Sequence, residues 1–426
     1  MSNIIYADGT PAVLVSVAES TQQLPECERS LDELERLLST AGGSTFARVI
    51  QIKDSFDPRT CIGSGKVAEV RRLCTDYGIP LVVFDFELSP SQIKNLENDI
   101  GDVRVIDRSM LILDIFAMHA TSGEGKLQVE LAQLKYSAPR LTGHGAELSR
   151  QGGGIGSRGP GESKLETDRR HLHERISTLR ARLTELEHNR AVMRSQRDRS
   201  GLKKIAIVGY TNAGKSTLLN LLTDAGVLSE DKLFATLDPT TRRLELLSGE
   251  SVLLTDTVGF IRKLPHHLVE AFKSTLDEVR YADILMIVTD ISDPEAEEHN
   301  AVTLDVIKEL GASDKPIIHV YNKCDLVGGV SCLIPEKHAV AISAANGIGA
   351  DLLLKLIDMT VCAGKREYAL LFPYGADGKL NALYKEYSVR SREYRDNGTL
   401  IYATLDERGA GLYKKYILPE SGEVGV

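Results

Sequence analysis

The sequence has few cysteines, and none of them form the patterns that hold small domains together. Its six cysteines lie scattered over 426 residues. There is no Cys-x-x-Cys pair and no histidine at a metal-binding spacing, so neither a disulfide framework nor a zinc site is indicated. We expect reduced thiols that mainly contribute to packing.

Long hydrophobic runs are also absent. No stretch of about 18 apolar residues occurs, which argues against a membrane-spanning helix. The opening residues 1–13 lack a basic region followed by an apolar run, so they do not resemble a signal peptide. We therefore expect a cytoplasmic protein, with peripheral contact to a membrane left open.

The chain lacks an overall excess of positive charge. Its net charge is −9, which indicates no general attraction to nucleic acid. One segment differs, because residues 164–204 contain twelve Lys or Arg against six Asp or Glu, a surplus of six. Either this segment contacts RNA phosphates or it is a solvated charged helix.

The chain is too long for one compact domain, and its patterns change along the sequence. Short apolar runs alternate with helix-like stretches in two regions, which predicts two α/β units. We expect an α/β multidomain protein with four parts: a small parallel α/β domain at residues 1–120, an antiparallel helical hairpin with a glycine-rich tip loop at 121–200, a doubly wound P-loop domain at 201–365, and a small α+β domain at 366–426.

Leucine spacing predicts the helical hairpin. Leu127, Leu131 and Leu134 follow one another at intervals of four and three, as one helical face requires. After a segment with eight glycines, residues 142–161, a second series recurs at heptad spacing. Its members are Leu165, Leu172, Ile176, Leu179, Leu183 and Leu186. Two apolar-seamed helices joined by one loop predict an antiparallel pair with the loop at its tip.

A phosphate-binding loop lies between an apolar strand and a helical run. The residues Gly209, Tyr210, Thr211, Asn212, Ala213, Gly214, Lys215 and Ser216 fit G-x-x-x-x-G-K-[ST]. Glycines let backbone N–H groups converge on phosphate oxygens. Lys215 is expected to neutralise the β- and γ-phosphates, and the Ser216 hydroxyl to bind Mg²⁺.

Three further motifs follow in order, each at the end of a predicted strand. Asp256, Thr257, Val258 and Gly259 form D-x-x-G, in which the aspartate is expected to hold Mg²⁺ through water and the glycine N–H to sense the γ-phosphate. Asn322, Lys323, Cys324 and Asp325 form N-K-x-D, whose carboxylate can accept both N1–H and N2–H of guanine. Ser343, Ala344 and Ala345 can supply a backbone N–H to the guanine O6. Together they predict a GTP-hydrolysing enzyme with Mg²⁺ as its cofactor.

The remaining magnesium ligand must be a threonine between Ser216 and Asp256. The segment Phe234, Ala235, Thr236, Leu237 and Asp238 offers Thr236. Thr240 and Thr241 are competitors, and spacing alone leaves the three open.

The motifs FATLDPTTRR, GYTNAGKST and DTVGFIRKLP resemble those of the HflX branch of the Obg-like translation GTPases. The segments LVVFDFELSPSQIKNLE, VRVIDRSMLILDIFA, EGKLQVELAQLKY and GGGIGSRGPGESKLETDRR are similar to its N-terminal region, so about 350 residues are covered. The resemblance implies that Thr236 binds Mg²⁺, which makes the expected catalytic set Lys215, Ser216, Thr236 and Gly259 and the metal ligands Ser216, Thr236 and Asp256.

The same resemblance implies a partner. In this family the N-terminal domain and the hairpin bind the large ribosomal subunit, and the tip loop approaches the peptidyl transferase centre. Such proteins split or rescue stalled ribosomes, notably under heat stress. We therefore expect a monomeric protein that contacts the large ribosomal subunit and its RNA.

Two other functions compete with ribosome splitting. One is an assembly chaperone in which GTP times release from immature large subunits. The other is an RNA-dependent ATPase or helicase that uses Gly63–Lys66 as a second phosphate loop. That segment lacks the four-residue spacer and the following Ser or Thr, so we favour a tight turn before a helix.

Phe260 follows the D-x-x-G motif where many Ras-like GTPases carry a glutamine that orients water. Phenylalanine cannot do so, and we expect slow intrinsic hydrolysis. Asn212 holds the P-loop position where potassium-stimulated GTPases also carry asparagine. Potassium is therefore a candidate cofactor, and a hydrogen bond from Asn212 to neighbouring backbone is the alternative.

Overall fold

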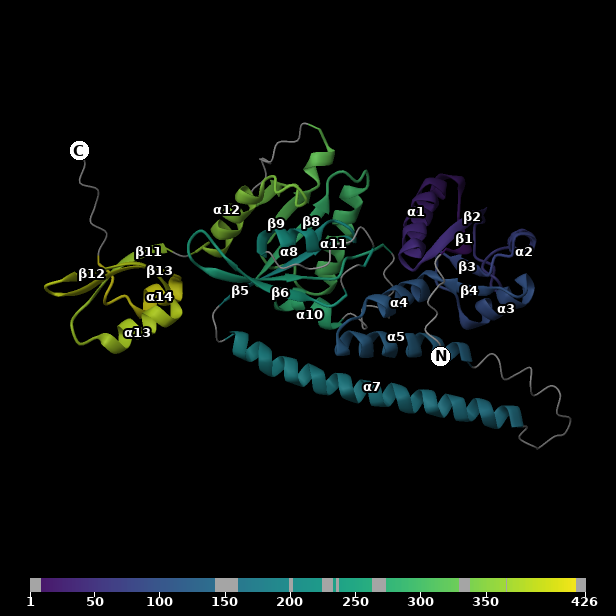
Figure 1. Cartoon of the computed structure of the whole chain (residues 1–426), viewed down its shortest axis with the longest axis horizontal. Coiled ribbons are helices and arrows are strands. Elements are labelled where there is room, and N and C mark those ends of the chain that lie inside the picture. The colour runs from purple at the N-terminus through teal and green to yellow at the C-terminus, as the bar shows by residue number, and fades with distance from the viewer. Residues whose placement is uncertain are drawn as a thin grey trace.

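The computed structural model describes residues 9–141, 160–198, 202–223, 233–234, 237–262, 273–328, 338–364 and 366–418. Within these ranges the chain forms a four-stranded, a six-stranded and a three-stranded sheet. Figure 1 shows the first and third sheets at opposite ends of the molecule, with the six-stranded sheet between them and one long helix along one side. The predicted α/β multidomain class is confirmed.

The N-terminal sheet is parallel, with strand order β2-β1-β3-β4. Its strands are β1 (Thr10–Ala18), β2 (Gly43–Ile52), β3 (Leu81–Phe84) and β4 (Arg104–Asp107). Its helices are α1 (Leu24–Thr40), α2 (Ser64–Tyr77) and α3 (Pro90–Ile100). Ser89 caps α3 through a reciprocal box with Gln92, and Pro90 takes the first helical position, as the sequence predicts.

Three helices connect this sheet to the central one: α4 (Arg108–His119), α5 (Gly123–Leu141) and α7 (Pro160–Asp198). Helices α5 and α7 lie antiparallel, as two ion pairs between them show: Glu124 pairs with Arg190, and Glu130, later in α5, pairs with Arg175, earlier in α7. The tip loop lies outside the described residues.

The apolar residues of this hairpin are buried to different extents. Leu172, Ile176 and Leu179 of α7 are buried as expected. On α5 the buried apolar side chains are Val129 and Ala132, while the predicted leucines of that helix are partly buried. Val129 and Ala132 share a core with residues of α4, because α5 packs on α4 as well as on α7.

The central sheet has the order β10-β9-β8-β5-β7-β6, and β6 runs antiparallel to β7. Its strands are β5 (Lys203–Gly209), β6 (Thr240–Glu245), β7 (Ser251–Asp256), β8 (Ile284–Asp290), β9 (Ile317–Asn322) and β10 (Ala339–Ala341). Its helices are α8 (Lys215–Thr223), α10 (Lys273–Tyr281), α11 (Ala296–Glu309) and α12 (Ala350–Val361). The sequence predicted the other five strands but missed β6, a polar edge strand without a continuous apolar run.

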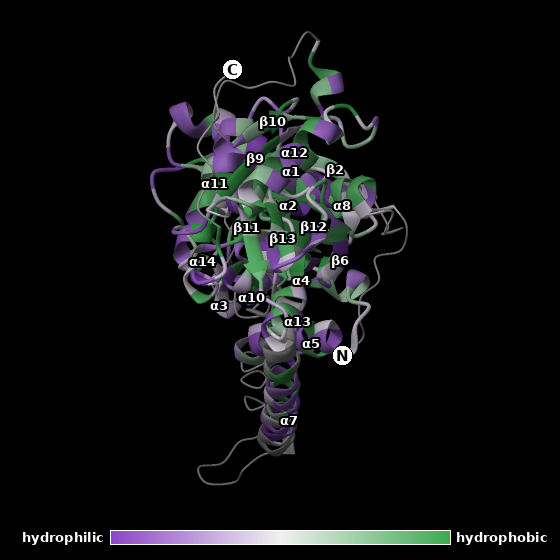
Figure 2. Ribbon diagram, turned by 90° about the vertical axis from the view of Figure 1, so that its left-hand side faces the viewer, coloured by the Kyte–Doolittle hydropathy of each residue, from purple (hydrophilic) through white to green (hydrophobic). Residues whose placement is uncertain are grey.

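The C-terminal region is an antiparallel sheet of order β11-β13-β12 with two helices, which confirms the α+β expectation. Its elements are β11 (Arg366–Phe372), α13 (Asp377–Glu386), β12 (Ser388–Arg395), β13 (Gly398–Leu405) and α14 (Glu407–Leu412). In Figure 2 this region overlaps the body of the molecule, while α7 projects below it with hydrophilic residues along its length. Among the described residues no helix is both long and apolar enough to cross a membrane.

Candidate functional site

The predicted phosphate loop connects the end of β5 to the start of α8. Two of its glycines are required by close contacts and by positive φ angles. At Gly209 (φ 151°) an added Cβ would collide with the Val288 carbonyl, and at Gly214 (φ 91°) with the Asn322 side-chain amide. The loop therefore lies directly against β8 and the N-K-x-D segment.

Lys215 is buried beneath this loop. Its Nζ donates to the Tyr210 carbonyl at 2.7 Å. Burial lowers the pKa of Lys215 to about 8, and the charge of Asp256 opposes that shift only in part. A buried ammonium group whose described partner is a neutral carbonyl is well suited to an anionic ligand.

Ser216 and Asp256, two of the three predicted metal ligands, are in contact. The Ser216 hydroxyl donates to Asp256 Oδ2 at 2.6 Å, and Asp256 is fully buried at the end of β7. A hydroxyl beside a carboxylate is the oxygen set that Mg²⁺ prefers, so these residues fit the ion. Thr236, the third predicted ligand, lies outside the described residues, as does Ala235.

The D-x-x-G segment pairs with the phosphate loop through the backbone. Phe260 N donates to the Gly209 carbonyl at 3.0 Å, and Thr211 N donates to the Phe260 carbonyl at 2.8 Å. Gly259 consequently lies in close contact with the loop. A Cβ added at Gly259 would lie 2.7 Å from Thr211 Cα and 3.0 Å from Lys215 Nζ. The residues between Asp256 and Gly259, Thr257 and Val258, are both buried.

The predicted base-recognition loops are joined to the phosphate loop by Asn322. Its amide donates to the Ala213 carbonyl at 2.8 Å, and its carbonyl oxygen accepts from Ala344 N at 2.9 Å. Lys323 has a positive φ of 64° and forms an ion pair with Asp290 at 2.7 Å. One side chain thus holds together three loops that are far apart in the sequence.

The groups predicted to read the base lie beside this junction. Cys324 N donates to the Ile342 carbonyl at 3.0 Å, which fixes the N-K-x-D turn next to residues 343–345. Ser343 and Ala344 are buried, whereas Asp325 and Ala345 are exposed. Within the described part of the chain the Asp325 carboxylate has no partner, so it is accessible to a base.

The structure does not bring Asp238 into this cluster. Its carboxylate accepts bonds from the backbone N–H and the hydroxyl of both Thr121 and Ser122, at 2.5–3.0 Å, where α5 begins. Burial would raise the pKa of Asp238, but these bonds outweigh it and lower the pKa. The predicted nucleotide-binding residue thus connects the segment after Thr236 to the hairpin.

Other residues of the segment around Thr236 also have partners within the protein. Phe234 packs edge-on against Phe116 of α4, with ring centroids 4.6 Å apart. Leu237 is buried. Of the competing threonines, Thr241 bonds the Thr255 hydroxyl at 2.9 Å, and Thr240 pairs with Asp256 in the sheet.

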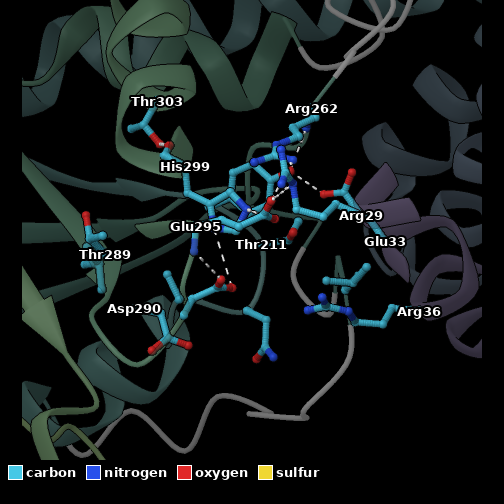
Figure 3. A pocket seen from close by; sticks show the side chains of 16 residues that line it. Arg29, Glu33, Arg36, Thr211, Arg262, Thr289, Asp290, Glu295, His299 and Thr303 are labelled. Carbon is cyan, nitrogen blue, oxygen red and sulfur yellow. Dashed lines mark hydrogen bonds and ion pairs between the residues drawn. The ribbon is translucent and has the colours of Figure 1, made fainter. Parts of the chain in front are cut away.

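Sequence reasoning missed the contact between the N-terminal region and the phosphate loop. The Tyr210 hydroxyl donates to Glu33 of α1, and Arg262 N donates to the Tyr210 hydroxyl at 2.9 Å. The Tyr210 ring stacks on His299 of α11 with centroids 3.8 Å apart. Figure 3 shows Glu33, Arg262 and His299 lining one pocket. Glu33 lies 177 residues before Tyr210, and no spacing pattern could have paired them.

Arg108 anchors the other side of Glu33. Its guanidinium is buried and bonds both Glu33 and Asp85, the latter at 2.8 Å. Burial lowers the pKa of Arg108, but the two carboxylates outweigh that effect and raise it. Glu33 is therefore held in place for Tyr210.

Gly63–Lys66 has the features of a turn before a helix. Gly63 N donates to the Gln51 side chain at 2.8 Å, and Lys66 forms an ion pair with Glu69 at 2.7 Å. Both groups that a phosphate would use already have partners within the protein.

The doubly wound sheet, the phosphate loop and the loops that converge on it define a P-loop GTPase. Three family models match the chain: GTP-binding GTPase N-terminal at residues 28–117, GTP-binding GTPase Middle Region at 119–197, and 50S ribosome-binding GTPase at 204–323. The chain belongs to the HflX GTPase family, because relatives named GTPase HflX are 39–48% identical to it over more than nine-tenths of its length.

Curated relatives named GTPase HflX match nearly the whole chain. The protein of Lacrimispora saccharolytica is 48% identical over 405 residues, with 95% of this chain and 96% of the relative covered. The Caldanaerobacter subterraneus protein is 48% identical, with 93% and 91% covered. The Escherichia coli K12 protein is 39% identical, with 92% of each covered.

Two similar solved structures are GTP-binding proteins with GDP. The complex of SsGBP and GDP is 25% identical with a TM-score of 0.46, covering 83% of this chain and 98% of that one. A GTP-binding protein from Sulfolobus solfataricus with GDP is 25% identical with a TM-score of 0.44, covering 83% and 99%.

Proposed function

We propose that this GTPase binds the large ribosomal subunit and uses GTP to dissociate or rescue ribosomes under stress. The observation that carries the proposal is the Asp238 contact, which ties the segment beside Thr236 to the first helix of the hairpin. A family described as 50S ribosome-binding GTPase matches residues 204–323 and supports the partner.

The nucleotide is held by the residues that converge on the phosphate loop. Lys215 neutralises the β- and γ-phosphates, and the Gly259 N–H detects the γ-phosphate. Ser216, Thr236 and Asp256 hold Mg²⁺, which when bound neutralises charge on the phosphate oxygens. Asp325 accepts the two guanine N–H groups, and the backbone of residues 343–345 binds O6.

Asp238 transmits the nucleotide state to the hairpin. Thr236 lies two residues before Asp238. Binding of Thr236 to Mg²⁺ beside the γ-phosphate would therefore change the position of Asp238. Asp238 is bonded to four donors at the start of α5, so α5 and the antiparallel α7 respond with it.

Helix α7 supplies the cations for ribosomal RNA. Arg169, Arg170, Arg180 and Arg182 are exposed along it. Arg175, which the sequence placed in the same group, instead makes a two-pronged contact with Glu130 of α5 at 2.8 and 3.0 Å. It therefore holds the hairpin together, and the four others meet phosphates.

Sedimentation of ribosomes tests the proposal. With a non-hydrolysable GTP analogue, the native protein should convert intact ribosomes into free subunits and sediment with the large one. Removal of residues 152–161 should abolish splitting and spare GTP binding. A protein that binds isolated large subunits but leaves intact ribosomes whole would instead be an assembly chaperone.

The salt dependence of binding tests the role of α7. Affinity for large subunits should fall steeply with salt, and the slope should decrease by about one for each of the four arginines replaced by alanine. The control is Arg242→Ala, an exposed arginine on β6. A flat salt dependence would assign α7 to the solvated surface.

Potassium beside Asn212 is a candidate source of positive charge for hydrolysis, and a hydrogen bond from Asn212 to neighbouring backbone is the alternative role of this residue. Asn212 has a positive φ of 60°, the left-handed conformation that asparagine tolerates in loops. GTP turnover with large subunits in matched potassium and sodium chloride tests this role. Equal turnover of the native protein in both salts would exclude it, and a preference lost in Asn212→Ala would assign the ion to this residue.

A further inference from the structure

A pocket lies between α1 and the phosphate loop. It is bordered by three α1 residues, by loop residues 211–213, by Leu233 ahead of Thr236, and by Arg262 after the D-x-x-G motif. The α1 residues are Arg29, Glu33 and Arg36, at intervals of four and three on one helical face. The first part of the phosphate loop and the segments beside Thr236 and Gly259 thus border this pocket together with α1.

The three arginines of the pocket differ in their partners. Arg29 forms an ion pair with Glu295 at 2.6 Å, and Arg262 pairs with Glu295 at 3.3 Å and with Glu298. For Arg36 the described part of the chain provides no carboxylate partner.

The acidic residues closest to Arg36 on α1 are already engaged. Arg48 binds both Asp32 and Glu35, the first at 2.6 Å. Glu33 is held by Arg108 and Tyr210. Arg36 therefore remains an available cation at the edge of the phosphate loop.

The Glu33–Tyr210 bond sets the register of α1 over the loop. Tyr210 is the second residue of the phosphate loop, and Arg36 lies one helical turn after Glu33. In Figure 3 the Arg36 side chain extends from α1 toward the pocket. The loop residues that share this pocket with it are Thr211, Asn212 and Ala213.

We propose that Arg36 is a catalytic cation for GTP hydrolysis, supplied by the N-terminal region of the same chain. The water oxygen bonds to the γ-phosphorus, the bond to the β,γ-bridging oxygen breaks with its electron pair kept by GDP, and the water proton passes to the departing phosphate. Arg36 neutralises the charge that develops on the γ- and bridging oxygens, as an arginine finger does. The proposal rests on the γ-phosphate lying at this loop.

Single-turnover hydrolysis of Arg36→Ala and Arg36→Lys tests the proposal, with Arg29→Ala as the matched control, because Arg29 is an arginine on the same face of α1. We expect Arg36→Ala to lower the rate of the chemical step at least about 100-fold with nearly unchanged affinity for GTP and GDP. Arg36→Lys should recover part of the rate, and Arg29→Ala should retain most of it. GDP with aluminium fluoride, a mimic of the transition state, should bind Arg36→Ala far more weakly than the native protein.

Unchanged hydrolysis and unchanged aluminium fluoride binding in Arg36→Ala would overturn the proposal. An equal loss in Arg29→Ala would also overturn it, because the effect would then come from the docking of α1. If the phosphate loop itself were misassigned, Lys215→Ala would keep its GTP affinity, which is a separate outcome. Repeating the assay in potassium and sodium chloride distinguishes Arg36 from an ion at Asn212.

Discussion

The N-terminal and central sheets share an architecture, but the polar groups at their strand ends differ in whether the protein itself supplies their partners. At the carboxyl ends of β3 and β4, Asp85 binds Arg108, and Asp107 accepts from Leu88 N, Met110 N and the Tyr136 hydroxyl. In the central sheet, Lys215 bonds a backbone carbonyl and Asp325 faces solvent. Parallel strands bring polar groups together in both cases, but only the second set is left for a ligand.

The pKa values of two buried cations, Arg108 and Lys215, shift in opposite directions. The pKa of Arg108 is raised, because Glu33 and Asp85 outweigh its burial. The pKa of Lys215 is lowered to about 8, because burial dominates. A buried cation paired with carboxylates is structural, whereas one whose hydrogen bond goes to a neutral carbonyl marks a candidate binding site.

The first test replaces one lysine in the phosphate loop and one in the glycine-containing turn Gly63–Lys66. Lys215→Ala should weaken GTP binding roughly 1,000-fold, about 4 kcal/mol, because a buried counter-charge for the phosphates is lost. Lys66→Ala should leave nucleotide binding unchanged. Fluorescent GTP titration measures both, and unaltered affinity in Lys215→Ala would refute the phosphate-loop assignment.

Substitution of the buried cation should reduce folding stability in the N-terminal region but not in the central one. Arg108→Ala should destabilise the N-terminal sheet by about 3 kcal/mol, because it leaves two buried carboxylates without their cation. Lys215→Met should leave the nucleotide-free protein at least as stable as the native one. Urea unfolding followed by hydrogen exchange in β1 and β5 reports the two regions separately, and equal destabilisation would remove the contrast.

Base selectivity depends on the exposed carboxylate of the central region. Asp325→Asn should lower GTP affinity roughly 100-fold and favour xanthine nucleotides, because the amide donates where the carboxylate accepted. Asp351→Asn, a substitution of another exposed aspartate on α12, is the control. Retained GTP selectivity in Asp325→Asn would mean that another group reads the base.

Proton linkage is the smallest expected effect. The pKa of free Lys215 is about 8, and a bound triphosphate raises it. At pH 8 GTP binding should therefore take up about half a proton, and affinity should decline as the pH rises through 8. Calorimetry in two buffers of different ionisation enthalpy measures the uptake, and none at pH 8 would show that Lys215 is charged before the ligand arrives.

The sequence by itself determined what depends on neighbours along the chain. The phosphate loop, the order of the four nucleotide motifs and the Ser89 cap follow from residues within a few positions of one another. Parallel α/β order then predicts that the motif ends meet, because the carboxyl ends of parallel strands share one edge. The contact of Ser216 with Asp256 agrees with that expectation.

Only the tertiary structure decided which distant groups meet. The strand β6, the contact of Asp238 with Ser122, the role of Arg175 within the hairpin and the bond from Tyr210 to Glu33 lie outside any local pattern. Each depends on how one packed element is oriented against another, and side-chain packing sets that orientation after the local structure has formed. The position of Arg36 beside the phosphate loop has the same origin, because α1 is held there by Glu33.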